Sequence, residues 1–315
     1  MSRRAVVLMN LGGPDSLSAV RPFLVNLFSD PAIIALPLPL RWLLARLIAW
    51  RRTKVARDIY AHLGGASPLL ANTEAQARAL EAELGAGYRC FVAMRYWHPL
   101  TRAAVAAVKA WQPDEVVCLP LYPQFSTTTT ASSLAAWRNE AQRQRLVVPT
   151  RVVEPYPSAA GFIAALAELI APVLDEARTA HKIRLLLSAH GLPLKIVRAG
   201  DPYPEQIQQT AAAVVRRLDR PELDWMICYQ SRVGPLAWLG PQTDAEIRRA
   251  GRDGVAVVVA PISFVSEHSE TLVELDRDYR RIAAAAGVPA YYRVPAVGTE
   301  PRFIAALAEL VKAAA

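Results

Sequence analysis

Two short motifs in this chain of 315 residues carry side chains that could transfer protons or bind a metal. Residues 188–193 read SAHGLP and contain His190, and residues 267–270 read EHSE and contain His268 and Glu270. An imidazole titrates near neutral pH, so His190 could accept protons from a bound molecule without a large change in its pKa. These residue types indicate acid–base or metal chemistry, although a histidine that only closes a turn would explain SAHGLP taken alone.

A series of carboxylates continues from the second motif. Glu270, Glu274 and Asp278 are spaced four residues apart, which would align them along one face of a helix. Like charges in this register oppose helix formation by about 0.2–0.5 kcal/mol per pair. One interpretation is a solvated helix face balanced by three nearby arginines, Arg277, Arg280 and Arg281. The other is an acidic path that binds a divalent cation or carries protons away from a histidine.

The elements that must position these motifs are buried strands. Residues 183–189 form an aliphatic run that ends at His190, and residues 255–260 form another before the second motif. A continuous apolar run of this length, ended by glycine or proline, is typical of a strand buried on both faces of a parallel sheet. Because such sheets bind ligands at the carboxyl ends of their strands, both motifs occupy the position of a functional site.

The same pattern of strands occurs twice along the chain. Apolar runs followed by turn residues and helical patterns lie at 5–11, 90–96, 116–122, 183–189, 225–229 and 255–260. Strands that alternate with helices imply right-handed crossovers and therefore parallel sheets. We predict an α/β fold of two similar Rossmann-like lobes, each a parallel sheet flanked by helices, with the active-site cleft between them. The predicted lobes are residues 1–155 and 156–315, and the terminal helix at 301–315 could also pack on the first lobe.

A basic and apolar segment at residues 36–52 is predicted to form a lip on the first lobe. Residues 31–57 contain six basic side chains and no acidic one. Five apolar residues recur at helical spacing, which predicts an amphipathic helix that starts near Pro37 and Pro39: Leu40, Leu43, Leu44, Leu47 and Ile48. The helix is too short and too charged to span a bilayer. It suits a membrane surface or the mouth of an apolar cleft, and an ordinary core-facing helix is the alternative.

Composition excludes several classes of protein. The net charge of +8 favours an acidic partner, but no long stretch has the pattern of a nucleic-acid module, so we expect no nucleic acid. The three cysteines are scattered, which favours a reducing compartment and a cytoplasmic protein without disulfides. No secretory signal, dinucleotide fingerprint, Walker loop or nucleophile elbow is visible. A nucleotide cofactor therefore has little support.

The motifs of this chain closely resemble those of the ferrochelatases, which insert ferrous iron into a porphyrin in the last step of haem synthesis. The shared motifs extend over nearly the whole chain and lie at residues 10–14, 51–53, 64–69, 94–99, 123–133, 188–193, 229–235 and 266–275. The pairing of SAHGLP with EHSETL is highly specific. The resemblance implies a chelatase-like fold, a lyase-type enzyme, and ferrous iron and protoporphyrin IX as its substrates.

The resemblance also assigns roles to individual residues. It implies that His190 and Glu270 are the catalytic and metal-binding pair, and that Glu267, Glu274 and Asp278 form the acidic path. The porphyrin-binding residues that it implies are Leu11, Arg52, Tyr60, Ser67, Arg95, Tyr96, Ser126, Trp238, Phe264 and His268. In this hypothesis His190 accepts pyrrole protons or ligates iron, while Glu270 supplies negative charge and a proton exit.

Departures from the family pattern refine these expectations. Some ferrochelatases hold an iron-sulfur cluster with cysteines near the C-terminus, whereas this chain ends in three alanines, so we expect no cluster and no tightly bound cofactor. Phe125 stands where some relatives have tyrosine, and Glu267 where others have aspartate. Residues 229–243 and 123–133 look more like those of the family members that use protoporphyrin than like those that use coproporphyrin III. The alternatives are a coproporphyrin enzyme, another tetrapyrrole chelatase and a non-catalytic porphyrin carrier. The segment at 36–52 could attach the protein peripherally to the inner face of the cell membrane.

Overall fold

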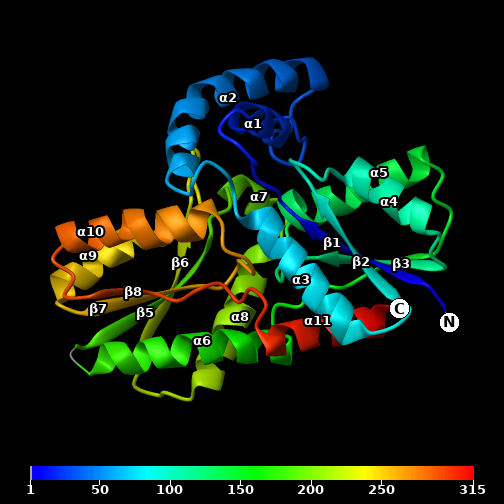
Figure 1. Cartoon of the computed structure of the whole chain (residues 1–315). Helices are drawn as coiled ribbons and strands as arrows, with labels where there is room; N and C mark the ends of the chain where they lie inside the picture. Colours follow the sequence, from blue (N-terminus) through cyan, green and yellow to red (C-terminus); the bar gives the residue numbers. More distant parts are fainter. Residues whose placement is uncertain (1, 180) are drawn as a thin grey trace. The chain divides into compact units, whose positions relative to one another are not determined.

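The computed structural model describes residues 2–179 and 181–315 and divides them into two compact units (Figure 1). Unit 1 runs to Pro155 and includes Leu307–Ala315, and unit 2 is Tyr156–Ala306. Each unit is built on a four-stranded parallel sheet, and the middle strands are aliphatic and buried on both faces. The prediction of two similar α/β lobes is confirmed.

The sheet of unit 1 has the strand order β2-β1-β3-β4. Its strands are β1 (Arg4–Asn10), β2 (Tyr88–Met94), β3 (Glu115–Pro120) and β4 (Thr150–Val152). The helices are α1 (Val20–Phe28), α2 (Leu38–Ala61), α3 (Leu69–Leu84), α4 (Thr101–Trp111), the π-helix η1 (Thr127–Ala131) and α5 (Ser132–Arg143). Side chains of α4 and α5, such as Val105 and Trp137, cover one face of the sheet. The last helix, α11 (Pro301–Ala314), crosses the boundary of the units.

The sheet of unit 2 repeats this arrangement with the order β6-β5-β7-β8. Its strands are β5 (Ile183–His190), β6 (Asp224–Gln230), β7 (Ala256–Pro261) and β8 (Tyr291–Arg293). The helices are α6 (Ala160–Arg178), α7 (Leu194–Arg198), α8 (Tyr203–Leu218), α9 (Thr243–Asp253), the π-helix η2 (Glu270–Asp278) and α10 (Tyr279–Ala285). Side chains of α9, η2 and α10 pack on one face of the sheet, among them Ile247, Leu275 and Ala283.

The sequence patterns predict the three long strands of each sheet within about three residues and miss β4 and β8. These two edge strands have three residues each, which is too few to show a strand period. β5 occupies a middle position between β6 and β7, so its carboxyl end lies at the centre of the edge where parallel sheets bind ligands. His190 is the last residue of that strand.

Helix α2 buries two alanines and a tyrosine, whereas none of its leucines is fully buried. Pro37 is the N-cap, as the position of the prolines predicts, and the buried residues are Ala45, Ala49 and Tyr60. Of the five residues on the predicted apolar face, Leu44 and Ile48 are half-buried, whereas Leu40, Leu43 and Leu47 are 58%, 62% and 43% exposed. The helix therefore packs through one side and exposes the other, and its role stays a prediction. No helix in the described part of the chain is long and apolar enough to cross a membrane.

Both units contain a π-helix at the same place in their topology. η1 and η2 each follow the third strand of their sheet and lead directly into an α-helix, α5 or α10. π-helical turns have hydrogen bonds five residues apart and are rare, and they occur frequently at functional sites. In unit 2 this turn begins at Glu270, one of the residues that the motifs single out.

Candidate active site

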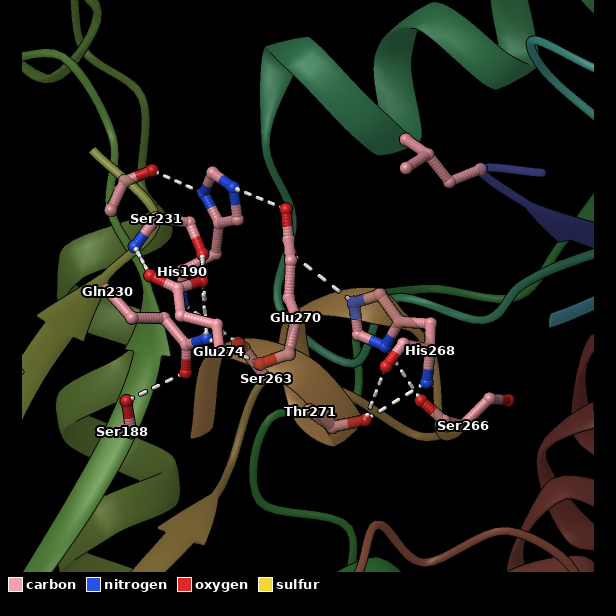
Figure 2. A network of polar contacts seen from close by, with 12 residues as sticks. Ser188, His190, Gln230, Ser231, Ser263, Ser266, His268, Glu270, Thr271 and Glu274 are labelled. Atoms are coloured by element: carbon pink, nitrogen blue, oxygen red, sulfur yellow. Dashed lines mark hydrogen bonds and ion pairs between the residues drawn. The ribbon is translucent and has the colours of Figure 1, made fainter. Parts of the chain in front are cut away.

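His190 projects from the carboxyl end of β5, where it is held from two sides (Figure 2). Its backbone N–H donates to Ser263 Oγ at 3.1 Å. Its ring Nδ1 lies 2.5 Å from the Gly191 carbonyl oxygen, which can only accept, so Nδ1 carries a proton. The other ring nitrogen, Nε2, therefore faces outward and lies 3.6 Å from Glu270 Oε1. The residue pair that the motifs single out meets within unit 2.

Glu270 is the first residue of η2 and lies between two imidazoles. Its Oε2 is 3.3 Å from His268 Nε2, while Oε1 faces His190. The loop before η2 is fixed by Thr271, whose hydroxyl accepts from the His268 backbone N–H at 2.9 Å and donates to its carbonyl at 3.1 Å. The carboxylate is thus held by the start of a helix and not by a loose loop (Figure 2).

The two charges shift each other's pKa in opposite directions. Removal from water lowers the pKa of His190, but the Glu270 carboxylate outweighs this effect and raises the pKa to about 9. For Glu270, removal from water raises the pKa, but the charge and hydrogen bond of His190, helped by His268, hold it well below its usual range. At neutral pH the pair is therefore an imidazolium and a carboxylate.

Glu274 is a second half-buried carboxylate near this pair, and it is held by neutral donors. Its oxygens accept from the Ser231 backbone N–H at 2.9 Å, the Ser231 hydroxyl at 2.5 Å and the Tyr279 hydroxyl at 2.9 Å. Gln230 Nε2 donates to it at 3.2 Å and to the Glu270 carbonyl at 3.1 Å. Burial and the charge of Glu270 outweigh these hydrogen bonds and raise the pKa of Glu274.

The remaining predicted acids are bound by arginines. Asp278 accepts from Arg277 Nε at 2.9 Å, and its side chain is 38% exposed. Glu267 accepts from Arg293 Nη1 at 2.8 Å and from the Ala296 backbone N–H at 3.0 Å. Glu270, Glu274 and Asp278 all lie on the π-helix η2 and not on an α-helix, and Asp278 pairs with Arg277. The acidic path stays a prediction.

Aromatic side chains border the His190 and Glu270 pair within unit 2. The Phe264 ring lies 6.3 Å from the His190 ring at 84° and 4.5 Å from the His268 ring at 64°, both edge to face. Trp238 packs on Gly191, where an added β-carbon would lie 3.2 Å from the indole and 2.9 Å from the Gln230 carbonyl oxygen. Position 191, directly after His190, therefore has no room for a β-carbon and requires glycine.

Comparison with known proteins places the chain in a family. The ferrochelatase family model matches residues 3–315. The ferrochelatase of Caulobacter vibrioides is 54% identical over 313 residues, which cover 98% of this chain and 89% of the relative. That of Wolbachia sp. subsp. Drosophila simulans is 50% identical over 312 residues, which cover 98% of each. The chain belongs to the ferrochelatase family. It is a metal-chelating enzyme of the lyase type, and the resemblance of its motifs is confirmed.

Solved chelatase structures share the fold. SirB from Bacillus subtilis with Fe3+ has a TM-score of 0.58 at 12% identity, over 99% of this chain and 96% of that chain. CbiX, described as the terminal enzyme for biosynthesis of sirohaem in denitrifying bacteria, has a TM-score of 0.51 at 19% identity, over 99% of each chain. At this identity the likeness concerns the fold alone.

The porphyrin contacts implied by the ferrochelatase motifs divide between the units. Trp238, Phe264 and His268 belong to unit 2, and the other seven belong to unit 1: Leu11, Arg52, Tyr60, Ser67, Arg95, Tyr96 and Ser126. Tyr96 is 1% exposed and belongs with Tyr60 to a hydrophobic cluster against which Leu11 packs. Ser126 caps η1 by accepting from the Thr128 backbone N–H at 3.2 Å. These roles stay predictions.

The structure adds residues that the ferrochelatase motifs do not assign to the site. Ser231 and Gln230 lie within the shared motif at 229–235, and Tyr279 follows the series of carboxylates by one residue. Their spacing to Glu274 on the chain gives no sign of the contacts, since Ser231 and Glu274 are 43 residues apart. In residues 2–179 and 181–315, no three His, Cys, Asp or Glu side chains converge as they would around a metal ion.

Proposed function

We propose that this ferrochelatase-family enzyme inserts Fe2+ into protoporphyrin IX to give protohaem and two protons, with His190 and Glu270 as the reacting pair. The observation that supports it is the 3.6 Å contact between His190 Nε2 and Glu270 Oε1 at the carboxyl end of β5. Free-base porphyrin carries two central N–H protons that the incoming cation must replace. The reaction therefore needs a proton acceptor and a negative charge close together.

The opposite pKa shifts suggest the order of events. Because the pKa of His190 is about 9, the imidazole already holds a proton on Nε2 at pH 7. A ferrous ion that approaches Glu270 replaces the imidazolium as the partner of that carboxylate, which lowers the pKa of His190 and releases its proton. The neutral imidazole is then free to accept one pyrrole proton on Nε2. The substrate cation itself thus converts His190 into a base.

Glu274 is proposed to accept the second pyrrole proton. Burial and the neighbouring Glu270 charge raise its pKa, which makes this carboxylate a better proton acceptor than an exposed glutamate. Its hydrogen bonds to Ser231 and Tyr279 keep it in place in either protonation state, because a protonated carboxyl still accepts through its second oxygen. Asp278 is proposed as the exit toward solvent, since its side chain is 38% exposed.

An anaerobic assay with Fe2+ tests the function directly. Purified protein is mixed with ferrous iron and either protoporphyrin IX or coproporphyrin III, and metal insertion is followed by absorbance. We expect protohaem formation, its loss in His190→Ala, and porphyrin binding that persists in that variant. Faster turnover of coproporphyrin III would assign the other substrate. Porphyrin binding without insertion by the wild-type chain would instead identify a carrier.

We also propose that α2 attaches the enzyme to the inner face of the cell membrane. The helix exposes Leu40, Leu43 and Trp50, with the last 63% exposed, among basic side chains that suit anionic lipids. Flotation with anionic liposomes is expected to carry the wild-type chain, and the double substitution Arg46→Glu and Arg51→Glu is expected to abolish it. The same charge change at the exposed α5 residues Arg138 and Arg143 serves as the control. Equal flotation of both variants would contradict the proposal.

A further inference from the structure

Unit 1 contains a buried carboxylate, Asp30, to which the ferrochelatase motifs assign no role. The residue is 4% exposed and lies just after α1. Its Oδ1 accepts from the Ala32 backbone N–H at 2.9 Å. Its Oδ2 accepts from three side chains: Arg95 Nη2 at 2.7 Å, the Tyr96 hydroxyl at 2.7 Å and the Ser132 hydroxyl. This one carboxylate oxygen thus accepts three hydrogen bonds.

These donors come from separate elements. Arg95 and Tyr96 follow the last residue of β2, and Ser132 is the first residue of α5. The Asp30 carbonyl in addition accepts from the Ile33 and Ile34 backbone N–H groups at 3.1 Å and 2.9 Å, in the turn that leads toward α2. Asp30 therefore ties the connection between α1 and α2 to the carboxyl end of a sheet strand, where parallel sheets bind ligands.

The contacts fix the Arg95 guanidinium on two sides and leave the third open. Nη2 donates to Asp30, and Nε donates to Ser132 Oγ at 2.7 Å. Nη1 has no hydrogen bond or ion pair with any residue that the structure describes, and the side chain is 23% exposed. The Tyr96 ring, whose hydroxyl is held by the same carboxylate, lies under the guanidinium at 4.9 Å.

A buried ion pair of this kind needs an explanation other than stability. Taking a carboxylate and a guanidinium out of water costs free energy that their attraction returns only in part, so apolar residues of the same size would often stabilise a fold as well. Removal from water raises the pKa of Asp30, but hydrogen bonds from Ser132, Ala32 and Tyr96 and the charge of Arg95 outweigh it, so the carboxylate stays ionised. The ion pair with Asp30 fixes the orientation of the Arg95 guanidinium.

We propose that Asp30 is a positioning residue for the porphyrin: it holds Arg95 so that Nη1 points at the bound macrocycle, and it holds the Tyr96 ring beneath that guanidinium. This inference rests on the proposed function and on the porphyrin contacts that the ferrochelatase motifs imply for Arg95 and Tyr96. Asp30 itself touches no substrate and acts through Arg95, which it holds directly and through the Tyr96 ring beneath the guanidinium. A side chain fixed before binding loses less conformational entropy when the ligand arrives, so the effect concerns porphyrin affinity more than iron.

The test uses Asp30→Asn, which keeps the shape of the side chain and removes its charge. We expect the KM for porphyrin and the Kd from a metal-free porphyrin titration to rise roughly tenfold. This corresponds to the lower end of the range of effects seen when a hydrogen bond to a charged group is lost. The KM for ferrous iron is expected to stay within about twofold. The control is Asp253→Asn, which removes an arginine pair from Arg184 at the other end of a strand in unit 2 and leaves that arginine its second partner, Asp224.

A double-mutant cycle separates positioning from a merely structural role. If Asp30 acts through Arg95, then adding Asp30→Asn to Arg95→Gln changes the porphyrin Kd by less than about twofold. Additive losses, or equal changes in the KM for iron and for porphyrin, would overturn the proposal. Because the titration contains no metal, it reports on Asp30 even if the wild-type chain inserts no iron. A wild-type chain that binds no porphyrin would overturn both this inference and the proposed function.

Discussion

The pKa of His190 gives the sharpest test of the site, because one neighbouring charge sets it. Substitution of Glu270 by glutamine keeps the shape of the side chain and removes the charge that outweighs the effect of burial. Only the Gly191 carbonyl, 2.5 Å from Nδ1, and the Glu274 carboxylate then still favour the charged ring. We expect the pKa to fall from about 9 to its ordinary 6.5 or below.

NMR titration of 13C-labelled histidine measures this pKa directly. The chain has five histidines, and the signal that disappears in His190→Asn identifies the ring of interest. Glu267→Gln is the matched control, because the Glu267 carboxylate is bound to Arg293 and is not among the groups that raise the pKa of His190, so its loss should leave that pKa unchanged. A wild-type ring that titrates near 6.5, or a Glu270→Gln ring that still titrates near 9, would refute the coupling and with it the proposed release of a proton by incoming iron.

Three further predictions follow from the same geometry. Tyr279→Phe removes a donor 2.9 Å from Glu274, so the pKa of Glu274 should rise further and the carboxyl group should be held less firmly and release its proton more slowly. We expect kcat to fall several-fold with an unchanged porphyrin KM, measured in the metal-insertion assay. Gly191→Ala places a β-carbon 2.9 Å from the Gln230 carbonyl oxygen and should lower the free energy of unfolding by about 1–3 kcal/mol, measured by urea denaturation. The raised pKa of His190 means that its contribution to stability is complete below its unfolded-state value of 6.5 and is lost as pH rises through about 9. The wild-type Tm should therefore fall more than that of Glu270→Gln between pH 6.5 and pH 9.

The sequence predicts the parts of the fold that depend on continuous local patterns. The aliphatic runs at 183–189 and 255–260 are long enough to mark β5 and β7, and they place His190 at a strand end and Glu270 just beyond a neighbouring one. The strands are adjacent in the sheet, so the contact between the two side chains follows from topology. The reaction is inferred from the family motifs, because the periodicity of apolar residues carries no information about it.

Other features depend on contacts between distant residues or on a choice between two faces. Asp30 and Arg95 are 65 residues apart, and no local pattern links them. For α2, the leucines form the more apolar face, yet the alanines are the residues that pack, because Ala45 and Ala49 allow a close approach to the rest of unit 1. A four-residue spacing of acids fits an α-helix and a π-helix alike. The sequence therefore does not show that Glu270 faces His190 while Glu274 is bound by Ser231.

The π-helical turn of η2 makes the geometry of the site in unit 2 sensitive to the number of residues in this segment. Deleting one residue between Glu270 and Glu274 would tighten the wide turn toward α-helical spacing and displace the Glu270 side chain relative to Glu274. Leu275 and Tyr279, on the far side of the deletion, would keep their packing against the sheet. The loss of a single peptide unit would then part the imidazole from its counter-ion while every side chain that reacts is still present.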